Sequence, residues 1–281
     1  EVGIRHRSPS RGLGDVYKRQ EVNGYQIRYI EEGSGKPIIF QSGLGFDASC
    51  DQFIPTMKLL ARKYRVISFD RFGWGLSDRP ETGYTFEAWS SLTTGFMDQL
   101  GIPQAVLVGH TLGGWVAALV AHQDPERVSH LILANTAGLN SIAPTPAQDY
   151  KIPDREGLKK SLERTFADAL DITESMIDEQ VSRAAKHNTA AAAYTEILRY
   201  VNDPEIRKAF WLPDRLQDIS IPSLVVWGAD DHIIGPEHGE QAAELLPNGQ
   251  LVLVANGEHI PPARKPTEFA QIVGKFLEEN Q

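Results

Sequence analysis

The chain has 281 residues, with 28 Lys and Arg against 37 Asp and Glu, a net charge of -9. This length fits one large domain with an insertion, and the acidic balance argues against nucleic acid as a partner, since phosphate binding needs a basic surface. The single cysteine, Cys50, excludes an internal disulfide and a thiolate metal cluster. No apolar run approaches the roughly 18 residues of a membrane-spanning helix, so we expect a cytoplasmic protein without a membrane span.

The first twenty residues differ from the rest of the chain. They hold five basic and two acidic residues, and they show neither apolar periodicity nor the hydrophobic region of a signal peptide. Residues 15–20, DVYKRQ, also resemble a translated adapter of the kind found at the ends of metagenomic sequence fragments. We therefore predict a non-native or disordered tail over residues 1–20.

From residue 21 the chain alternates short β-rich runs with longer amphipathic stretches. Asn23-Gly24, between the runs 21–22 and 25–30, is a strong hairpin signal because both turn positions need positive φ. Runs rich in Val, Ile and Leu, typical of strands buried on both faces, follow at 37–41, 64–69, 105–108, 128–134, 223–227 and 250–254. Helical patterns separate them, at 53–62, 85–100, 112–123, 237–246 and 266–277. This alternation predicts an α/β fold with a doubly wound, mostly parallel sheet.

The alternation stops between residues 139 and 213. Three helical patterns and no convincing strand occupy this stretch, at 155–170, 173–187 and 189–200. Prolines mark its entrance and its exit, from Pro144 to Pro213. We predict a helical cap, residues 139–213, inserted into an α/β core made of residues 21–138 and 214–281.

Residues 106–114, VLVGHTLGG, run from an apolar strand through a glycine-bounded turn into a helix. This is the context of a G-x-S-x-G nucleophile elbow, in which small residues allow a sharp turn that presents one side chain at the carboxyl edge of the sheet. The five positions are filled by Gly109, His110, Thr111, Leu112 and Gly113. Threonine therefore stands where serine is expected.

With this motif the chain resembles the α/β-hydrolase family over residues 21–280. Residues 70–77, DRFGWGLS, are similar to the family's D-x-x-G-x-G-x-S segment. Residues 42–45, SGLG, stand where relatives often carry H-G-x-G, the loop that supplies an oxyanion-hole amide. Residues 228–231 and 257–259 are similar to the acid loop and the histidine loop, and the order of nucleophile, acid and histidine agrees with the family.

The resemblance implies a catalytic set for acyl transfer that needs no metal and no organic cofactor. Thr111 would be the nucleophile, His259 the general base, and Asp231 the acid that orients the imidazole. The backbone amides of Leu44 and Leu112 would form the oxyanion hole. The residues expected to support this loop and the elbow are Gly43, Gly109, His110 and Gly113.

Three interpretations of Thr111 stay open. Positive φ at an elbow is unfavourable for a β-branched residue, and the extra methyl group restricts the rotamers that aim the hydroxyl. The chain is then a hydrolase with a slow threonine nucleophile, a pseudoenzyme or small-molecule binding protein on the same fold, or a hydrolase whose serine has been changed by error or design.

Some neighbouring residues have plainer interpretations. His110 fits a hydrogen-bonded support better than a catalyst, and Cys50 fits a small buried residue. Trp74 and Trp115 fit core packing as well as a pocket lining. Asn135 stands at an alternative acid position of the family but carries no carboxylate, which favours Asp231 as the acid.

A hydroxyl at the elbow favours carbonyl substrates, namely a carboxylic ester, a lactone or an activated C–C bond. Residues 131–139 and the elbow flanks are similar to the branch that contains carboxylesterases, enol-lactonases and hydrolases of ring-cleavage products. Five cap residues predict a partly apolar pocket and hence a hydrophobic acyl or aromatic substrate: Phe166, Met176, Ile177, Tyr194 and Leu198.

Overall fold

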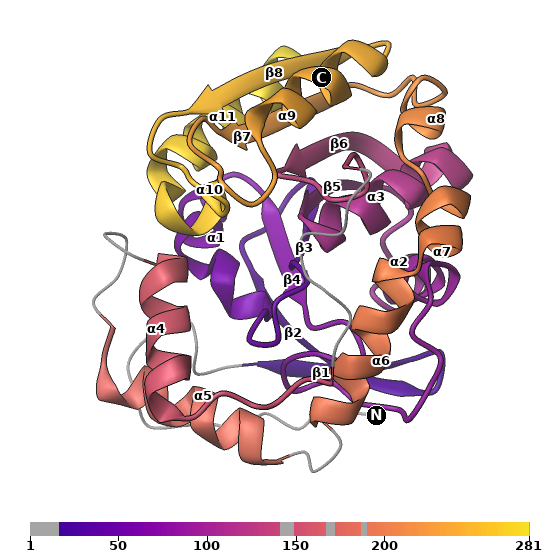
Figure 1. The fold of residues 1–281 in the computed structure, drawn as a ribbon. Helices are drawn as coiled ribbons and strands as arrows, with labels where there is room; N and C mark the ends of the chain where they lie inside the picture. Colours follow the sequence, from indigo (N-terminus) through magenta and orange to yellow (C-terminus); the bar gives the residue numbers. More distant parts are fainter. Residues whose placement is uncertain (1–16, 141–148, 167–171, 187–189, 281) are drawn as a thin grey trace.

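The computed structural model describes residues 17–140, 149–166, 172–186 and 190–280 (Figure 1). Its centre is an eight-stranded sheet in the order β1-β2-β4-β3-β5-β6-β7-β8. The pairs β1·β2 and β2·β4 are antiparallel and the other neighbours are parallel. The strands are β1 Lys18–Val22, β2 Tyr25–Glu32, β3 Pro37–Gln41, β4 Arg65–Phe69, β5 Ala105–His110, β6 Val128–Ala134, β7 Ser223–Gly228 and β8 Gly249–Val254. The predicted α/β fold class is confirmed.

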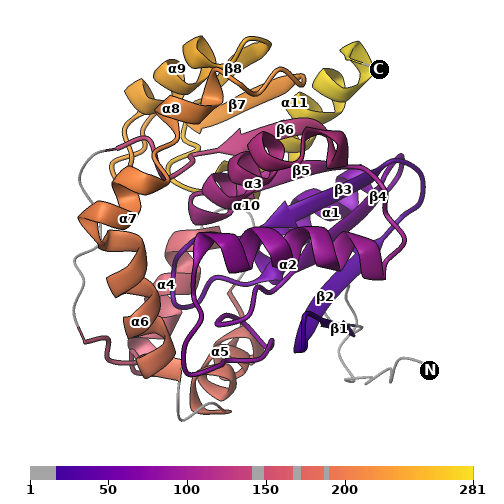
Figure 2. The ribbon, with the colours of Figure 1, turned by 90° about the vertical axis from the view of Figure 1, so that its right-hand side faces the viewer.

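The two faces of the sheet bury different side chains, because successive residues of a strand point to opposite faces. In β5, for example, Leu107 belongs to one apolar cluster and Val108 to the other. One face is covered by α2 and α3, and the other by α1 and α11 (Figure 2). The helices that flank the sheet are α1 Ile54–Leu60, α2 Phe86–Gln99, α3 Leu112–Gln123, α9 Pro236–Leu245 and α11 Pro266–Glu279.

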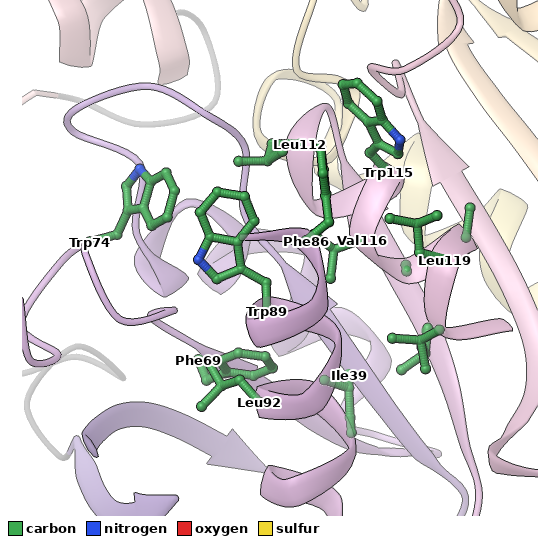
Figure 3. Close-up of a cluster of buried hydrophobic side chains, with 14 of the residues drawn as sticks. Ile39, Phe69, Trp74, Phe86, Trp89, Leu92, Leu112, Trp115, Val116 and Leu119 are labelled. Carbon is green, nitrogen blue, oxygen red and sulfur yellow. The ribbon is translucent and has the colours of Figure 1, made fainter. Parts of the chain in front are cut away.

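Helix α3 is apolar on every side, and each of its residues from 112 to 121 is buried. It packs against β5, β6 and α2, and Figure 3 shows Trp115 and Val116 of α3 beside Phe86 and Trp89 of α2. Trp115 and Trp74 are both fully buried core residues. Because α3 is enclosed in this way, the position of its first residue, where the predicted elbow lies, is fixed by the core.

Helices α4 to α7 occupy the stretch between β6 and β7, and the short α8 leads back to the sheet (Figure 1). Their bounds are α4 Arg155–Phe166, α5 Glu174–Lys186, α6 Ala190–Asn202, α7 Pro204–Ala209 and α8 Pro213–Leu216. The three predicted helices are present as α4, α5 and α6, although their predicted ends at 167–170, 187 and 189 lie outside the described residues. Helix α7 was not predicted, yet Asp203 caps it by accepting hydrogen bonds from the next two free N–H groups, and a proline opens it.

The hairpin at the start of the sheet shows that the predicted tail, residues 1–20, is too long. Asn23 and Gly24 have φ values of 53° and 83°, as the predicted turn requires. Lys18, Arg19 and Gln20, however, form the first three positions of β1 and pair with β2. They were missed because an edge strand is joined to its neighbour by main-chain hydrogen bonds, which leave no apolar pattern in these polar side chains.

A buried arginine joins β2 to the short 3-10 helix Cys50–Phe53 and to the loop after β4. Arg28 is 1% exposed, and its guanidinium donates to the carboxylates of Asp51 at 2.7 Å and Asp70 at 3.2 Å and to Cys50 Sγ at 3.0 Å. Asp70 is fully buried and also accepts the main-chain N–H groups of Cys50 and Leu76. The charge of Asp70 therefore depends on Arg28 for compensation.

Replacing Arg28 by methionine removes the cation that forms an ion pair with this buried carboxylate. We expect Arg28→Met to lower the free energy of unfolding by about 3–5 kcal/mol, the usual cost of breaking a buried ion pair from one side. Urea unfolding measures the loss. The control is Lys63→Met, which breaks the exposed pair between Lys63 and Glu278 and should leave stability unchanged.

Candidate active site

The strand β5 ends and α3 begins at Thr111, whose backbone has φ 44° and ψ -111°. Positive φ strains a β-branched residue by about 1–3 kcal/mol, so the surroundings must impose it. Main-chain hydrogen bonds do this: Thr111 N–H donates to Ala134, and the Thr111 carbonyl accepts from Gly114, Trp115 and Ala137. The chain thus has the sharp turn of a nucleophile elbow with threonine at its apex.

Two glycines make room for this turn. A Cβ atom on Gly109 would lie 2.4 Å from the carbonyl oxygen of Gly113, and one on Gly113 would lie 2.1 Å from the carbonyl oxygen of Gln41 in β3. Neither position accepts a side chain unless the backbone moves. The elbow is therefore packed directly against the end of β3, and the loop that follows β3 begins beside it.

Asp231 follows β7, His259 follows β8, and the two side chains meet. His259 Nδ1 donates to Asp231 Oδ2 at 2.8 Å, which leaves Nε2 as the basic nitrogen of the ring. Burial alone raises the pKa of Asp231, but hydrogen bonds from His259, Asn135 and the Ile233 N–H more than offset it. The pKa of Asp231 therefore lies below its ordinary value, and the carboxylate is ionised at neutral pH.

Asn135, at the end of β6, holds the acid and the histidine loop together. Its Nδ2 donates to Asp231 Oδ2 at 2.6 Å and to the carbonyl oxygen of Glu258 at 3.0 Å. Its Oδ1 accepts the N–H of Gly228 at 3.2 Å. From the sequence, Asn135 was only a residue at the family's alternative acid position that carries no carboxylate. In the structure its amide donates hydrogen bonds, which an ionised carboxylate at this position could not do.

His110 joins the elbow to the histidine loop. Its Nε2 donates to the carbonyl oxygen of His259 at 2.8 Å, so Nδ1 is the acceptor and takes an N–H of the Gln52 side chain at 3.2 Å. Burial, reinforced by His259, lowers the pKa of His110 to about 3, and the ring is neutral. Gln52 was not predicted, because it lies in the short 3-10 helix Cys50–Phe53, outside every motif, and meets His110 only in the folded chain.

One cavity of about 530 Å³ brings most of the predicted site together. Its lining includes Gly43, Leu44, His110, Thr111, Asp231 and His259. Three predicted residues, Gly109, Leu112 and Gly113, are not among its lining residues: the two glycines are on the packed side of the elbow, and the side chain of Leu112 is buried in the core.

Helices α4, α5 and α6 supply part of the lining, but the prediction of which apolar residues face the cavity was only partly right. Met176 and Tyr194 line it. Ile177 and Leu198 do not, since Ile177 belongs to a small apolar cluster under α4 and α5 and Leu198 belongs to the main core. The side chain of Phe166 lies outside the described residues. Both misses share a cause, because each helix also has to bury an apolar face against the rest of the protein.

Within the described part of the chain, no group of three or more His, Cys, Asp or Glu side chains is arranged to hold a metal ion. None of the helices described there is long and apolar enough to cross a membrane.

A family model described as alpha/beta hydrolase fold matches residues 36–266. The chain belongs to the α/β hydrolase fold family. The family suggested by the elbow, the acid loop and the histidine loop is thus confirmed, and the protein is an α/β-fold hydrolase.

Individual relatives cover nearly the whole chain. It is 29% identical, over 91% of its length and 94% of the relative's, to the uncharacterized hydrolase YugF of Bacillus subtilis (strain 168). It is 27% identical, over 93% of its length and 91% of the relative's, to a 2-hydroxy-6-oxo-6-(2'-aminophenyl)hexa-2,4-dienoic acid hydrolase of Metapseudomonas resinovorans. A solved meta-cleavage product hydrolase from Pseudomonas fluorescens IP01 shares the fold, with a TM-score of 0.80 at 24% identity over 94% of this chain and 98% of that one.

The neutral state of His110 has a consequence for stability. The pKa is about 3 in the folded chain and about 6.5 in the unfolded chain, so between these pH values the unfolded chain holds an extra proton. The stability that the neutral His110 ring contributes is fully present above pH ~6.5. As the pH falls below this value, the free energy of unfolding decreases by at most about 1.4 kcal/mol per pH unit.

We expect His110→Gln, which keeps a donor and an acceptor but does not titrate, to lose this component of the pH dependence. Urea unfolding at several pH values from about 7 down to about 4.5 measures the slope of the free energy of unfolding. His122→Gln, at the far end of α3, is the matched control. Equal slopes for the native protein and His110→Gln would show that residue 110 is not a buried neutral histidine.

Proposed function

We propose that the protein hydrolyses uncharged carboxylic esters or lactones, with Thr111 as nucleophile, His259 as general base and Asp231 as the orienting acid. The observation that carries this proposal is that Thr111, at the strained elbow, lines the same cavity as the His259–Asp231 pair, whose hydrogen bond of 2.8 Å leaves Nε2 free to act as base. Helices α4 to α6 would act as the cap over this cavity, within the insertion of residues 139–213.

In this mechanism His259 Nε2 takes the proton of the Thr111 hydroxyl as its oxygen bonds to the substrate carbonyl carbon. The N–H groups of Leu44 and Leu112 donate hydrogen bonds to the carbonyl oxygen and stabilise the negative charge that develops on it. Leu112 is the first residue of α3, where N–H groups have no partner within the helix. The imidazolium then protonates the leaving alcohol, and water repeats the sequence to release the acid.

The methyl group of Thr111 has a definite place. A Cβ atom added to Gly43 would lie 2.2 Å from Thr111 Cγ2, so this methyl group packs on the Cα of Gly43, beside the oxyanion loop. The hydroxyl is consequently confined to the remaining staggered positions about χ1. The methyl group also occupies space next to the atoms that become tetrahedral in the reaction, which slows turnover relative to serine.

The charge of the cavity favours a neutral substrate. Six carboxylates are among its lining residues: Asp47, Asp51, Glu179, Asp230, Asp231 and Glu258. Two of the six pair with an arginine: Asp51 with Arg28 at 2.7 Å, and Glu258 at 2.6 Å with Arg264, which also lines the cavity. An acidic lining repels an anion, so an ester or lactone fits it better than the C–C bond of a dienoic acid, the substrate class in the name of one relative.

A second candidate function is small-molecule binding without turnover. It is favoured by the same methyl group, since a strained threonine packed on the oxyanion loop preserves the cavity while hindering attack. The two candidates differ only in whether the Thr111 hydroxyl reacts.

Variants at Thr111 separate them. With p-nitrophenyl butyrate we expect Thr111→Ser to raise kcat about ten-fold, equal to about 1.4 kcal/mol, and Thr111→Ala to abolish turnover. A fluorophosphonate probe followed by peptide mass analysis should label residue 111 in the native protein and in Thr111→Ser. If the native protein matches Thr111→Ala in both assays while Thr111→Ser is active, the native protein is a binder and not a catalyst.

The acidic lining makes a separate prediction about a charged and an uncharged ester with the same leaving group. After subtraction of spontaneous hydrolysis, which the carboxylate of the succinate ester accelerates, we expect kcat/KM for the mono-p-nitrophenyl ester of succinate to be about ten-fold or more below that for p-nitrophenyl butyrate. Added salt should narrow the difference because it screens the repulsion. A preference for the succinate ester would contradict the prediction and would favour anionic substrates.

A further inference from the structure

Two side chains from the loop after β4 hold the oxyanion loop, residues 42–45, by its carbonyl groups. Arg71 is fully buried, and its Nη1 and Nη2 donate to the carbonyl oxygens of Ser42 at 2.8 Å and Gly43 at 2.9 Å. Trp74 Nε1 donates to the next two carbonyl oxygens, those of Leu44 at 3.3 Å and Gly45 at 3.1 Å. The Arg71 guanidinium lies 4.7 Å from the centre of the Trp74 ring, so the two side chains also form a cation–π contact with each other.

The geometry of a trans peptide relates the direction of the Gly43 carbonyl to the direction of the Leu44 N–H. The carbonyl of one residue and the N–H of the next point in opposite directions. Arg71 is not among the residues that line the cavity, whereas Gly43 and Leu44 are. When the Gly43 carbonyl points at Arg71, the Leu44 N–H therefore points to the cavity side. A peptide turned the other way would present a carbonyl oxygen to the developing anion.

We propose that Arg71 is a positioning residue that keeps the Gly43–Leu44 peptide turned with its N–H toward the cavity and so forms half of the oxyanion hole. The inference rests on the proposed hydrolytic function. A cation bound to the carbonyl also polarises the peptide, which makes the N–H of Leu44 a stronger donor. Trp74 donates to the carbonyls of the next two residues, and so it holds the loop but does not determine the direction of the Leu44 N–H.

The cost of burying Arg71 supports a role of this kind. Arg28, also fully buried, compensates two carboxylates, whereas the hydrogen bonds of Arg71 go to main-chain carbonyls. Burial lowers the pKa of Arg71 to about 9, opposed by the charge of Asp70, and the guanidinium is still protonated at neutral pH. A buried cation paired with dipoles stabilises a fold poorly. A guanidinium whose two Nη atoms donate to successive carbonyls is, by contrast, well suited to fixing the orientation of a peptide plane.

The kinetic test compares Arg71→Met with a matched buried arginine. Arg207 also donates to two carbonyl oxygens, those of Val201 and Asn140, and lies 5.3 Å from the centre of the Trp115 ring, but it is not a lining residue of the cavity. With p-nitrophenyl butyrate, Arg71→Met should lower kcat about 100-fold, as expected for loss of one oxyanion donor, with KM changed less than about two-fold. Arg207→Met should lose stability but keep kcat.

The inference is overturned if Arg71→Met keeps its kcat, if only its KM changes, or if Arg207→Met loses kcat equally. Should Arg71→Met not fold, Arg71→Lys takes its place. Lysine reaches one carbonyl and cannot bridge two, so kcat should fall about ten-fold, and an unchanged kcat overturns the inference.

Crystal structures of the native protein and the Arg71 variant test the peptide independently of hydrolysis. We expect a single orientation of the Gly43–Leu44 peptide in the native protein and a turned or doubled orientation in the variant. If the native protein hydrolyses no ester, the proposed function fails while these structures still decide the role of Arg71. A single native orientation in the variant overturns that role, even if the protein proves to be an esterase.

Discussion

The site depends on one constraint, the left-handed backbone at Thr111. A β-branched residue does not adopt φ 44° unless its surroundings impose it, and here the buried helix α3 does so. Because α3 is enclosed on every side, its first turn cannot move without opening the core. The glycines at 109 and 113 let the strand, the helix and the end of β3 meet without a clash. The stability of the core is thus what holds the hydroxyl of residue 111 at the cavity.

Around the elbow, buried side chains hold the neighbouring loops by their main-chain carbonyls. His110 binds the carbonyl of His259, Asn135 binds that of Glu258, and Arg71 binds those of Ser42 and Gly43. Each contact joins segments that are distant in sequence, and each is made to a main-chain carbonyl of the loop and not to its side chains. Precise orientation of loops is the requirement that electrostatic catalysis places on a scaffold, because donors must already point at the charge that develops.

Much of the fold could be predicted because its signals are local. The strands Pro37–Gln41 and Val128–Ala134 and the helix Leu112–Gln123 have the predicted bounds, since apolar runs and a glycine-bounded turn specify them. The contacts that complete the site could not be predicted in this way. Gln52 reaches His110 across 58 residues, and Arg71 reaches Ser42 across 29. Such pairs depend on strand order and loop path, which leave no periodic trace in the sequence.

The methyl group of Thr111 connects the elbow with loop 42–45. Because Thr111 Cγ2 packs on Gly43, Thr111 and the loop that Arg71 holds are in direct contact. A serine at position 111 would lose this contact and gain rotational freedom, so its hydroxyl would be less confined but less crowded. With threonine, the direction of the hydroxyl depends on the position of Gly43, and the position of Gly43 depends on Arg71. With threonine at the elbow, the orientation of the residue 111 hydroxyl and the orientation of loop 42–45 are therefore coupled.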